Sequence, residues 1–435
     1  MKQSIGVDRM KSSFSMVVVL VSICLVAEIR AEDPPYLTTQ SPITLFSTND
    51  GEVKQLTQLT DEQTTDWELK TKDSFTVIRL GPDHPPIIKT VYDTAPCSIY
   101  GTPTMAMSQD GRYALVANHS WRPENAHKLQ LPDGPQTNAD LTLESLRQQE
   151  MTAQRVNMLS LIDLSTPDFR VVDRVLFDDR PMHVLAHPDG QRFVTGGDKN
   201  FYLHRIENGK LKEVSRSPQS HGLACFWLHP QGHRLIATQG DPLSGLPATV
   251  QWYSILGDRI EHLSEVKVAP HVPSELLDTS FILRVSPDGK HALICQRSVG
   301  NGTDHSDILF ADLTLEKPVI NTVVKQASDG SESFAFHPNG KMAVATALAD
   351  HHNCIVVLDI ASTPPRLLYT LDTAPESQGI EFTPEGDKLF VGSPRAGRIE
   401  VFDVVGDYEL RKNPKFLNVG FGHNSLTIGP TFKQD

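Results

Sequence analysis

His187-Pro188-Asp189-Gly190, within MHVLAHPDGQRFVTGG (182–197), is one of six related tetrapeptides in this chain. The others are SQDG, HPQG, SPDG, HPNG and TPEG, which end at Gly111, Gly232, Gly289, Gly340 and Gly386. Proline presets φ at the second position of a turn, and glycine accepts a positive φ without steric cost. Short β-rich segments flank each tetrapeptide, so each repeat is predicted to open with two antiparallel strands joined by a hairpin turn.

The spacing of these turns predicts the architecture. Successive turn glycines are 79, 42, 57, 51 and 46 residues apart, and the longest interval contains an insertion. Such a period is typical of a four-stranded propeller blade. A third strand in most repeats ends in an apolar-Asp pair, as in CIVVLDI (354–360), and a more polar fourth strand follows. Hydrophobicity therefore falls outward along each repeat, as expected when only the outer strand meets water.

The two ends of the repeat region predict how the ring closes. Segments 74–80 and 86–92 resemble third and fourth strands without a preceding turn, while SLTIGP (425–430) begins like an inner strand. We therefore predict an all-β, seven-bladed β-propeller of four-stranded antiparallel blades, closed by joining N- and C-terminal strands; eight blades is the alternative. Closure would remove the exposed sheet edge. The propeller is expected over 74–430, with 32–73 leading into it.

Residues 1–31 are predicted to be a secretory signal peptide. Lys11 precedes an apolar core, 16–27, that is too short to span a bilayer, and Ala31 is a suitable residue before a cleavage point. The mature chain is thus expected to be secreted or periplasmic, without an integral membrane span. A formal charge of −13 without a basic cluster argues against nucleic acid as a partner. No CxxCH motif is present, which excludes covalently attached c-type haem, and the cofactor stays unknown.

The repeats, together with YALVANHS (113–120), resemble the YVTN and lactonase-like seven-bladed propellers over roughly 74–430. That resemblance implies the propeller fold. It also implies a choice of activities, because this group includes lactone hydrolases, cofactor-binding propellers and exported proteins without an established role.

Candidate site residues follow from the geometry of a blade. Residues before the first strand and after the second share one rim of the propeller, and this rim is the usual binding face. Alignment of the repeats on their turns selects His183, His423, Glu332, Arg297 and Arg395 as candidate catalytic residues. It selects Thr104, Asn118, Ser333, Gln378 and Asn424 as candidate ligand-binding residues. His187, His229 and His337 fall in the turns at the opposite face and are predicted to be structural.

Two further features lie on this rim. Asp350, His351 and His352, with Asp198 and Asp241, could form a metal site, but such loop residues are usually solvated, so no metal is assigned. The insertion 121–154 leaves from the same rim, and its segment 139–151 has the pattern of a short amphipathic helix. The insertion is predicted to be a flap over the tunnel mouth or a loop packed on a neighbouring blade.

The sequence leaves two functions open. The first is an exported propeller whose rim binds a small molecule, a glycan or another exported protein. The alternative is a lactonase-like hydrolase that acts on a lactone or a sugar-derived ester. In that case His183 or His423 would activate water, and Arg297 or Arg395 would stabilise the oxyanion.

Overall fold

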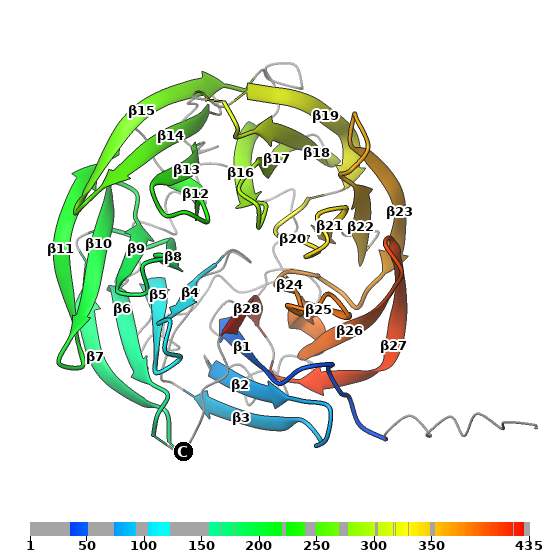
Figure 1. Ribbon diagram of the computed structural model, residues 1–435, viewed down its shortest axis with the longest axis horizontal. Helices are drawn as coiled ribbons and strands as arrows, with labels where there is room; N and C mark the ends of the chain where they lie inside the picture. Colours follow the sequence, from blue (N-terminus) through cyan, green and yellow to red (C-terminus); the bar gives the residue numbers. More distant parts are fainter. Residues whose placement is uncertain are drawn as a thin grey trace, which may run out of the picture. The chain divides into compact units, whose positions relative to one another are not determined.

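The computed structural model describes residues 35–50, 74–92, 103–121, 156–166, 168–177, 179–219, 223–239, 249–268, 277–300, 303–315, 317, 319–328, 330–348, 353–420 and 422–429. The predicted signal peptide and segment 122–154 of the insertion lie outside these residues. The described strands form seven four-stranded antiparallel sheets arranged in a ring (Figure 1). The predicted all-β, seven-bladed propeller is therefore confirmed. All described strands belong to the compact unit Tyr36–Asp435.

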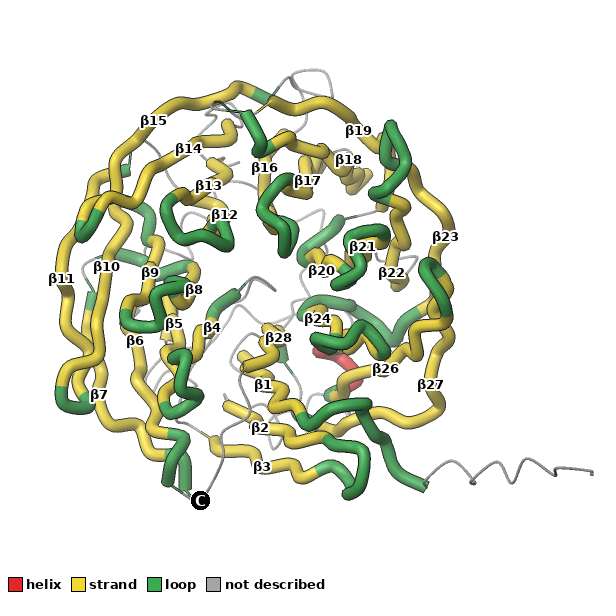
Figure 2. The backbone as a smooth tube through the Cα atoms, viewed as in Figure 1, coloured by secondary structure: helices red, strands yellow, loops and turns green. Residues whose placement is uncertain are grey.

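Six blades each consist of four strands that are consecutive in the chain. The first three contain β4 (Met105–Met107), β5 (Tyr113–Trp121), β6 (Val156–Asp163), β7 (Arg170–Leu176); β8 (His183–Ala186), β9 (Arg192–Gly196), β10 (Asn200–Glu207), β11 (Lys210–Pro218); and β12 (Leu223–Leu228), β13 (Arg234–Gln239), β14 (Thr249–Leu256), β15 (Arg259–Lys267). The next three contain β16 (Leu277–Val285), β17 (His291–Gly300), β18 (Thr303–Asp312), β19 (Val319–Ser328); β20 (Phe334–Phe336), β21 (Met342–Leu348), β22 (Asn353–Asp359), β23 (Arg366–Asp372); and β24 (Ile380–Phe382), β25 (Lys388–Ser393), β26 (Arg398–Val405), β27 (Glu409–Asn418). A short 3₁₀ helix, η3 (Pro394–Ala396), interrupts the otherwise strand-and-loop backbone between β25 and β26 (Figure 2).

The seventh blade joins the two ends of the chain. Its order is β28 (His423–Gly429), β1 (Ile43–Asp50), β2 (Ser74–Leu80) and β3 (Ile87–Tyr92). Strand β1 pairs antiparallel with β28, with Thr48 opposite Ser425. The predicted closure is confirmed. Strands β2, β3 and β28 were predicted from the sequence, but β1 was not, because β1 is not joined to the inner strand by the repeated turn.

The repeated turns have the predicted geometry. All six turn glycines have φ between 69° and 77°, where a side chain would clash with the backbone. Each turn is closed by a backbone hydrogen bond, as from Gly190 N to the His187 carbonyl oxygen at 2.9 Å. The tetrapeptides therefore recur because the same tight turn recurs.

The turn histidines connect adjacent blades. His187 Nε2 lies 2.8 Å from the Gly232 carbonyl oxygen, and His337 Nε2 lies 2.9 Å from that of Gly386, in each case in the next blade. The Nδ1 atom of each ring accepts a backbone N–H two residues ahead in its own turn. In the tautomer that carries its proton on Nε2, each imidazole caps its own turn while donating to the neighbouring one. This agrees with the structural role predicted for these histidines.

The hydrophobic core lies between the blades. One cluster of buried apolar side chains fills each junction between neighbouring blades in the described part of the propeller. The outer strands, in contrast, are largely exposed or half-buried, as in β7 and β23. The predicted outward fall in hydrophobicity is confirmed.

No helix among the described residues has the length and apolar character needed to cross a membrane.

His204 in β10 is expected to make the second blade sensitive to acid. Its imidazole is fully buried, lies against the rings of Phe177 and Tyr202, and neither ring nitrogen has a hydrogen-bond partner in the described part of the chain. Burial lowers the pKa of His204 from 6.5 to about 4. The folded state therefore binds fewer protons than the unfolded state between these values, and stability present above pH 6.5 is lost as the pH falls toward 4.

We expect this residue to account for about 2 kcal/mol of stability lost between pH 6.5 and about pH 5. The measurement is urea unfolding of the protein and of His204→Phe, which keeps an aromatic ring without a titratable group. The phenylalanine variant should lose about 2 kcal/mol less on acidification over this interval. Equal acid sensitivity of the two proteins would contradict the assignment.

Candidate functional site

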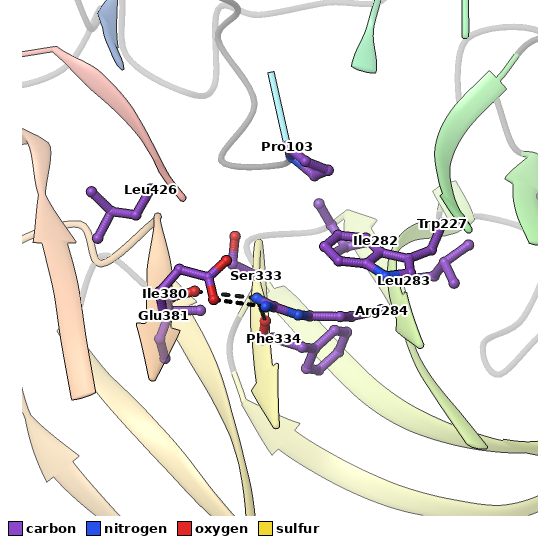
Figure 3. A pocket seen from close by; sticks show the side chains of 10 residues that line it. All are labelled: Pro103, Trp227, Ile282, Leu283, Arg284, Ser333, Phe334, Ile380, Glu381 and Leu426. Atoms are coloured by element: carbon purple, nitrogen blue, oxygen red, sulfur yellow. Dashed lines mark hydrogen bonds and ion pairs between the residues drawn. The ribbon is translucent and has the colours of Figure 1, made fainter. Parts of the chain in front are cut away.

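A cavity lies at the axis of the propeller, where the inner strands of several blades converge (Figure 3). About 310 Å³ of space lies among the side chains here, including space that opens to solvent. Its lining residues come from β12, β16, β20, β24, β28 and the segments before β4 and β20: Pro103, Trp227, Ile282, Leu283, Arg284, Ser333, Phe334, Ile380, Glu381 and Leu426. Two charged side chains therefore lie among residues of mainly apolar type.

Arg284 and Glu381 form an ion pair in this cavity. Arg284 Nη2 donates to Glu381 Oε2 at 2.7 Å, and Figure 3 shows the two side chains pointing toward each other from different blades. Arg284 Nη1 also donates to the main-chain oxygens of Phe334, at 2.7 Å, and Ile380, at 3.3 Å. The Trp227 ring lies beside the guanidinium, with its centroid 4.9 Å from Cζ. Arg284 thus bridges three blades beyond its own.

The local sequence explains how these side chains reach the axis. Trp227, Arg284 and Glu381 each lie two residues before the first residue of a blade's repeated turn. Alternate residues of a strand share one face, so this position points to the same side as the position four residues before the turn. The residues predicted for the inner strands were those at the latter position, so Trp227, Arg284 and Glu381 were not among the predicted site residues. The available signal was a charge within two short apolar strands, FILRV (281–285) and GIEFT (379–383).

The electrostatics of the pair favour a reactive carboxyl group. The side chains of Arg284 and Glu381 are only 19% and 15% exposed. Burial raises the pKa of Glu381, and the attraction of the Arg284 guanidinium opposes this rise only in part. A carboxyl group with a raised pKa in a cavity is a candidate for proton transfer.

Three of the predicted rim residues lie close together. Glu332 and Gln378 are buried, and Gln378 Nε2 donates to Glu332 Oε2 at 2.8 Å between two blades. Ser333 lines the axial cavity, and its backbone N–H donates to Thr346 Oγ1 at 3.0 Å. Ser333 therefore places the predicted pair next to the cavity wall.

Other predicted residues are buried between blades. The His183 side chain is 0% exposed, packs against Phe226 with ring centroids 6.0 Å apart, and is not part of the cavity lining. Thr104 Oγ1 lies 3.2 Å from Thr48 Oγ1 in a buried contact with the seventh blade, and Asn118 is buried in β5. Catalytic use of His183 stays a prediction, and the burial of its ring weighs against it.

The remaining predicted residues lie further along the rim or outside the described side chains. Arg395, in η3, donates through Nε to Glu376 Oε2 at 3.1 Å. Arg297 lies on β17, and His423 and Asn424 lie on β28, but their side chains are outside the described part of the structure. Their predicted roles therefore stay predictions.

Most of the residues considered as metal ligands are also outside the described part of the structure. Asp241, Asp350, His351 and His352 are not described, and Asp198 accepts a hydrogen bond from Arg180 Nη2 at 3.2 Å. Within the described ranges, no group of three or more His, Cys, Asp or Glu side chains is arranged to hold a metal ion.

Comparison with known proteins supports the fold. No protein-family model matches the chain, and no curated protein matches its sequence. A candidate 6-phosphogluconolactonase from Bacteroides uniformis superposes with a TM-score of 0.61 at 13% identity, covering 89% of this chain and 100% of the other. The Pseudomonas aeruginosa periplasmic gluconolactonase PpgL gives a TM-score of 0.59 at 14% identity, covering 90% and 99%. The chain therefore has the seven-bladed fold of lactonase-like propellers.

The same fold is found in a protein with a different name. Hydrazine synthase from Kuenenia stuttgartiensis gives a TM-score of 0.53 at 14% identity, covering 76% of this chain and 91% of the other. Structural similarity at this level of identity describes the arrangement of the blades only. Any activity has to be argued from the side chains of the cavity.

Proposed function

We propose that the axial cavity hydrolyses a small lactone. The observation that carries this proposal is the Arg284–Glu381 pair, a buried carboxyl group and a guanidinium that face one cavity from different blades. The lactonase names of two proteins with the same fold add support by analogy. Of the two functions left open by the sequence, the cavity therefore favours the hydrolase, with a different set of residues from those predicted.

The chemistry requires a base and a group that stabilises negative charge. Glu381, in its ionised form, takes a proton from water as the water oxygen adds to the lactone carbonyl carbon. An N–H of Arg284 donates to the carbonyl oxygen as it becomes negative. The ring C–O bond then breaks, and Glu381 returns the proton to the departing oxygen. The product is an open-chain hydroxy acid.

Trp227 would orient the substrate. Its ring is half-buried beside Arg284 and presents flat apolar surface to the cavity. The C–H face of a small ring packs well on such surface, and the exclusion of water strengthens the electrostatic contacts of Arg284. A single-ring substrate is proposed because the space among these side chains is small.

Export and rim binding also belong to this proposal. We place the protein in the periplasm or outside the cell on the basis of the N-terminal sequence 1–31. Binding of a ligand or an exported protein at the rim stays a prediction, since most of the insertion lies outside the described residues. It becomes the preferred function if the cavity has no hydrolytic activity.

The test is hydrolysis of aliphatic, aryl and sugar lactones by the protein and by Glu381→Gln. The glutamine has the same shape but cannot take a proton from water, so we expect kcat to fall about 100-fold or more. Glu376→Gln, in the Arg395–Glu376 pair on the rim, is the matched control and should retain the rate. A chelator in parallel reactions tests metal dependence.

Two results would contradict the proposal. One is absence of turnover across the whole panel. The other is equal kcat in the protein and Glu381→Gln, which would place any hydrolysis at another site.

A further inference from the structure

The partners of Arg284 are of two kinds. Two main-chain oxygens, of Phe334 and Ile380, and the Trp227 ring belong to the body of the propeller and hold the guanidinium in place. Glu381 is its ion-pair partner, and its carboxylate stands at the end of a flexible side chain. An anion that enters the cavity can therefore replace Glu381 without disturbing the other contacts.

The ion pair of Arg284 and Glu381 has a single hydrogen bond between the two side chains. This bond runs from Nη2 to Oε2, whereas a bidentate arrangement would have two parallel bonds. A carboxylate on a small ligand could form the same bond from inside the cavity. The free-energy cost of the exchange would then depend on whether the released Glu381 side chain stays charged or takes up a proton.

We propose that this cavity binds small organic carboxylates by exchange, in which the ligand carboxylate replaces Glu381 on Arg284 and the released Glu381 takes up one proton from solvent. The protonated carboxyl group needs no cation, so it can stay in a partly buried position after losing its partner. Because burial already raises the pKa of Glu381, this proton is taken up readily once Arg284 is withdrawn.

Among the described side chains, Arg284 is the dominant charged neighbour of Glu381. Strand β20 carries no titratable side chain, and Lys388 of β25 is paired with Asp403 at 2.7 Å. Strand β16 also carries Asp278 and β28 carries His423, whose side chains are outside the described part. Exchange of the Arg284 partner should therefore act directly on the titration of Glu381.

This inference concerns the cavity of the proposed function, but it does not require turnover. If the protein is a lactonase, the consequence depends on that function: the hydroxy acid product carries the carboxylate that competes for Arg284. Product inhibition should then be stronger at lower pH, because binding consumes a proton.

The experiment is isothermal titration calorimetry with gluconate and with benzoate, at about pH 6, 7 and 8, in two cationic buffers of different ionisation enthalpy. Neither probe is a lactone, so absence of hydrolysis leaves the result interpretable. We expect uptake of one proton per ligand bound. We also expect the Kd to rise by about tenfold per pH unit where Glu381 is ionised in the free protein.

Variants separate exchange from ordinary binding. In Glu381→Gln, binding should persist without proton uptake and with a Kd independent of pH. Arg284→Lys keeps a cation but loses the planar guanidinium, and it should bind at least tenfold more weakly. Glu376→Gln should behave as the unmodified protein.

Three outcomes would overturn the inference: no binding of either probe, binding without proton uptake by the unmodified protein, or unchanged proton uptake in Glu381→Gln. The first of these, together with hydrolysis that depends on Glu381, would reject carboxylate exchange and retain the proposed function. Proton-linked binding without hydrolysis would reject the proposed function and retain carboxylate exchange.

Discussion

Replacement of Arg284 by glutamine is expected to destabilise the propeller by about 3–5 kcal/mol. The substitution leaves Glu381 without its cation in a site where it is only 15% exposed, so near neutral pH Glu381 either stays charged or takes up a proton, and both cost stability. It also leaves the main-chain oxygens of Phe334 and Ile380 without the Arg284 donor and removes the guanidinium from the face of Trp227. Three blades beyond its own lose a shared contact at once. The measurement is the free energy of unfolding in urea near neutral pH.

Matched variants show whether the unpaired charge causes this loss. The double substitution Arg284→Gln with Glu381→Gln removes both charges, so it should recover a large part of the lost stability. Lys212→Gln breaks an exposed pair with Glu207 and should change stability by less than about 1 kcal/mol. A loss below about 1 kcal/mol in Arg284→Gln itself would show that the axial pair does not stabilise the ring.

Gly386→Ala should destabilise the propeller by about 3 kcal/mol, and Gly340→Ala by only about 1 kcal/mol. Both glycines end repeated turns and have nearly equal φ, 77° and 71°, so the backbone strain of an alanine is matched. A Cβ at Gly386 would lie 2.4 Å from His337 Nε2, whereas nothing lies within 4 Å of one at Gly340. The difference therefore measures the contact between adjacent blades.

The comparison is made by urea unfolding of the two alanine variants. His337→Ala combined with Gly386→Ala removes the clash, so the penalty of the second substitution should shrink toward that of Gly340→Ala. Equal destabilisation by the two single glycine variants would mean that the turn histidine does not stabilise the junction.

The fold could be predicted because its determinants are local. A turn such as HPNG (337–340) sets the backbone direction through residues adjacent in the chain, and the repeat supplies the same information six times. Strand β1 was missed because it has no such turn, and its pairing with β28 joins residues near opposite ends of the chain.

The candidate site was predicted less well because it depends on which side chains of different blades meet at the axis of the ring. The rim position selected Glu332, Ser333 and Gln378, which do lie together, but it also selected His183, which is buried between blades. Arg284 and Glu381 are 97 residues apart and meet only after the blades are placed around the ring. No local sequence pattern predicts that contact, although a charged residue in an apolar inner strand is a usable indication.

The seventh blade has a consequence for synthesis of the protein. Its inner strand, β28 (His423–Gly429), follows all the other described strands in the chain, while β1 and β2, in the same blade, precede them. During translation, the edge of β1 that pairs with β28 therefore has no partner within its own blade until β28 has been made. A chain terminated before β28 would keep this unsatisfied edge, which is a feature that chaperones and proteases can act on. Ring closure thus distinguishes chains that contain β28 from chains that end before it.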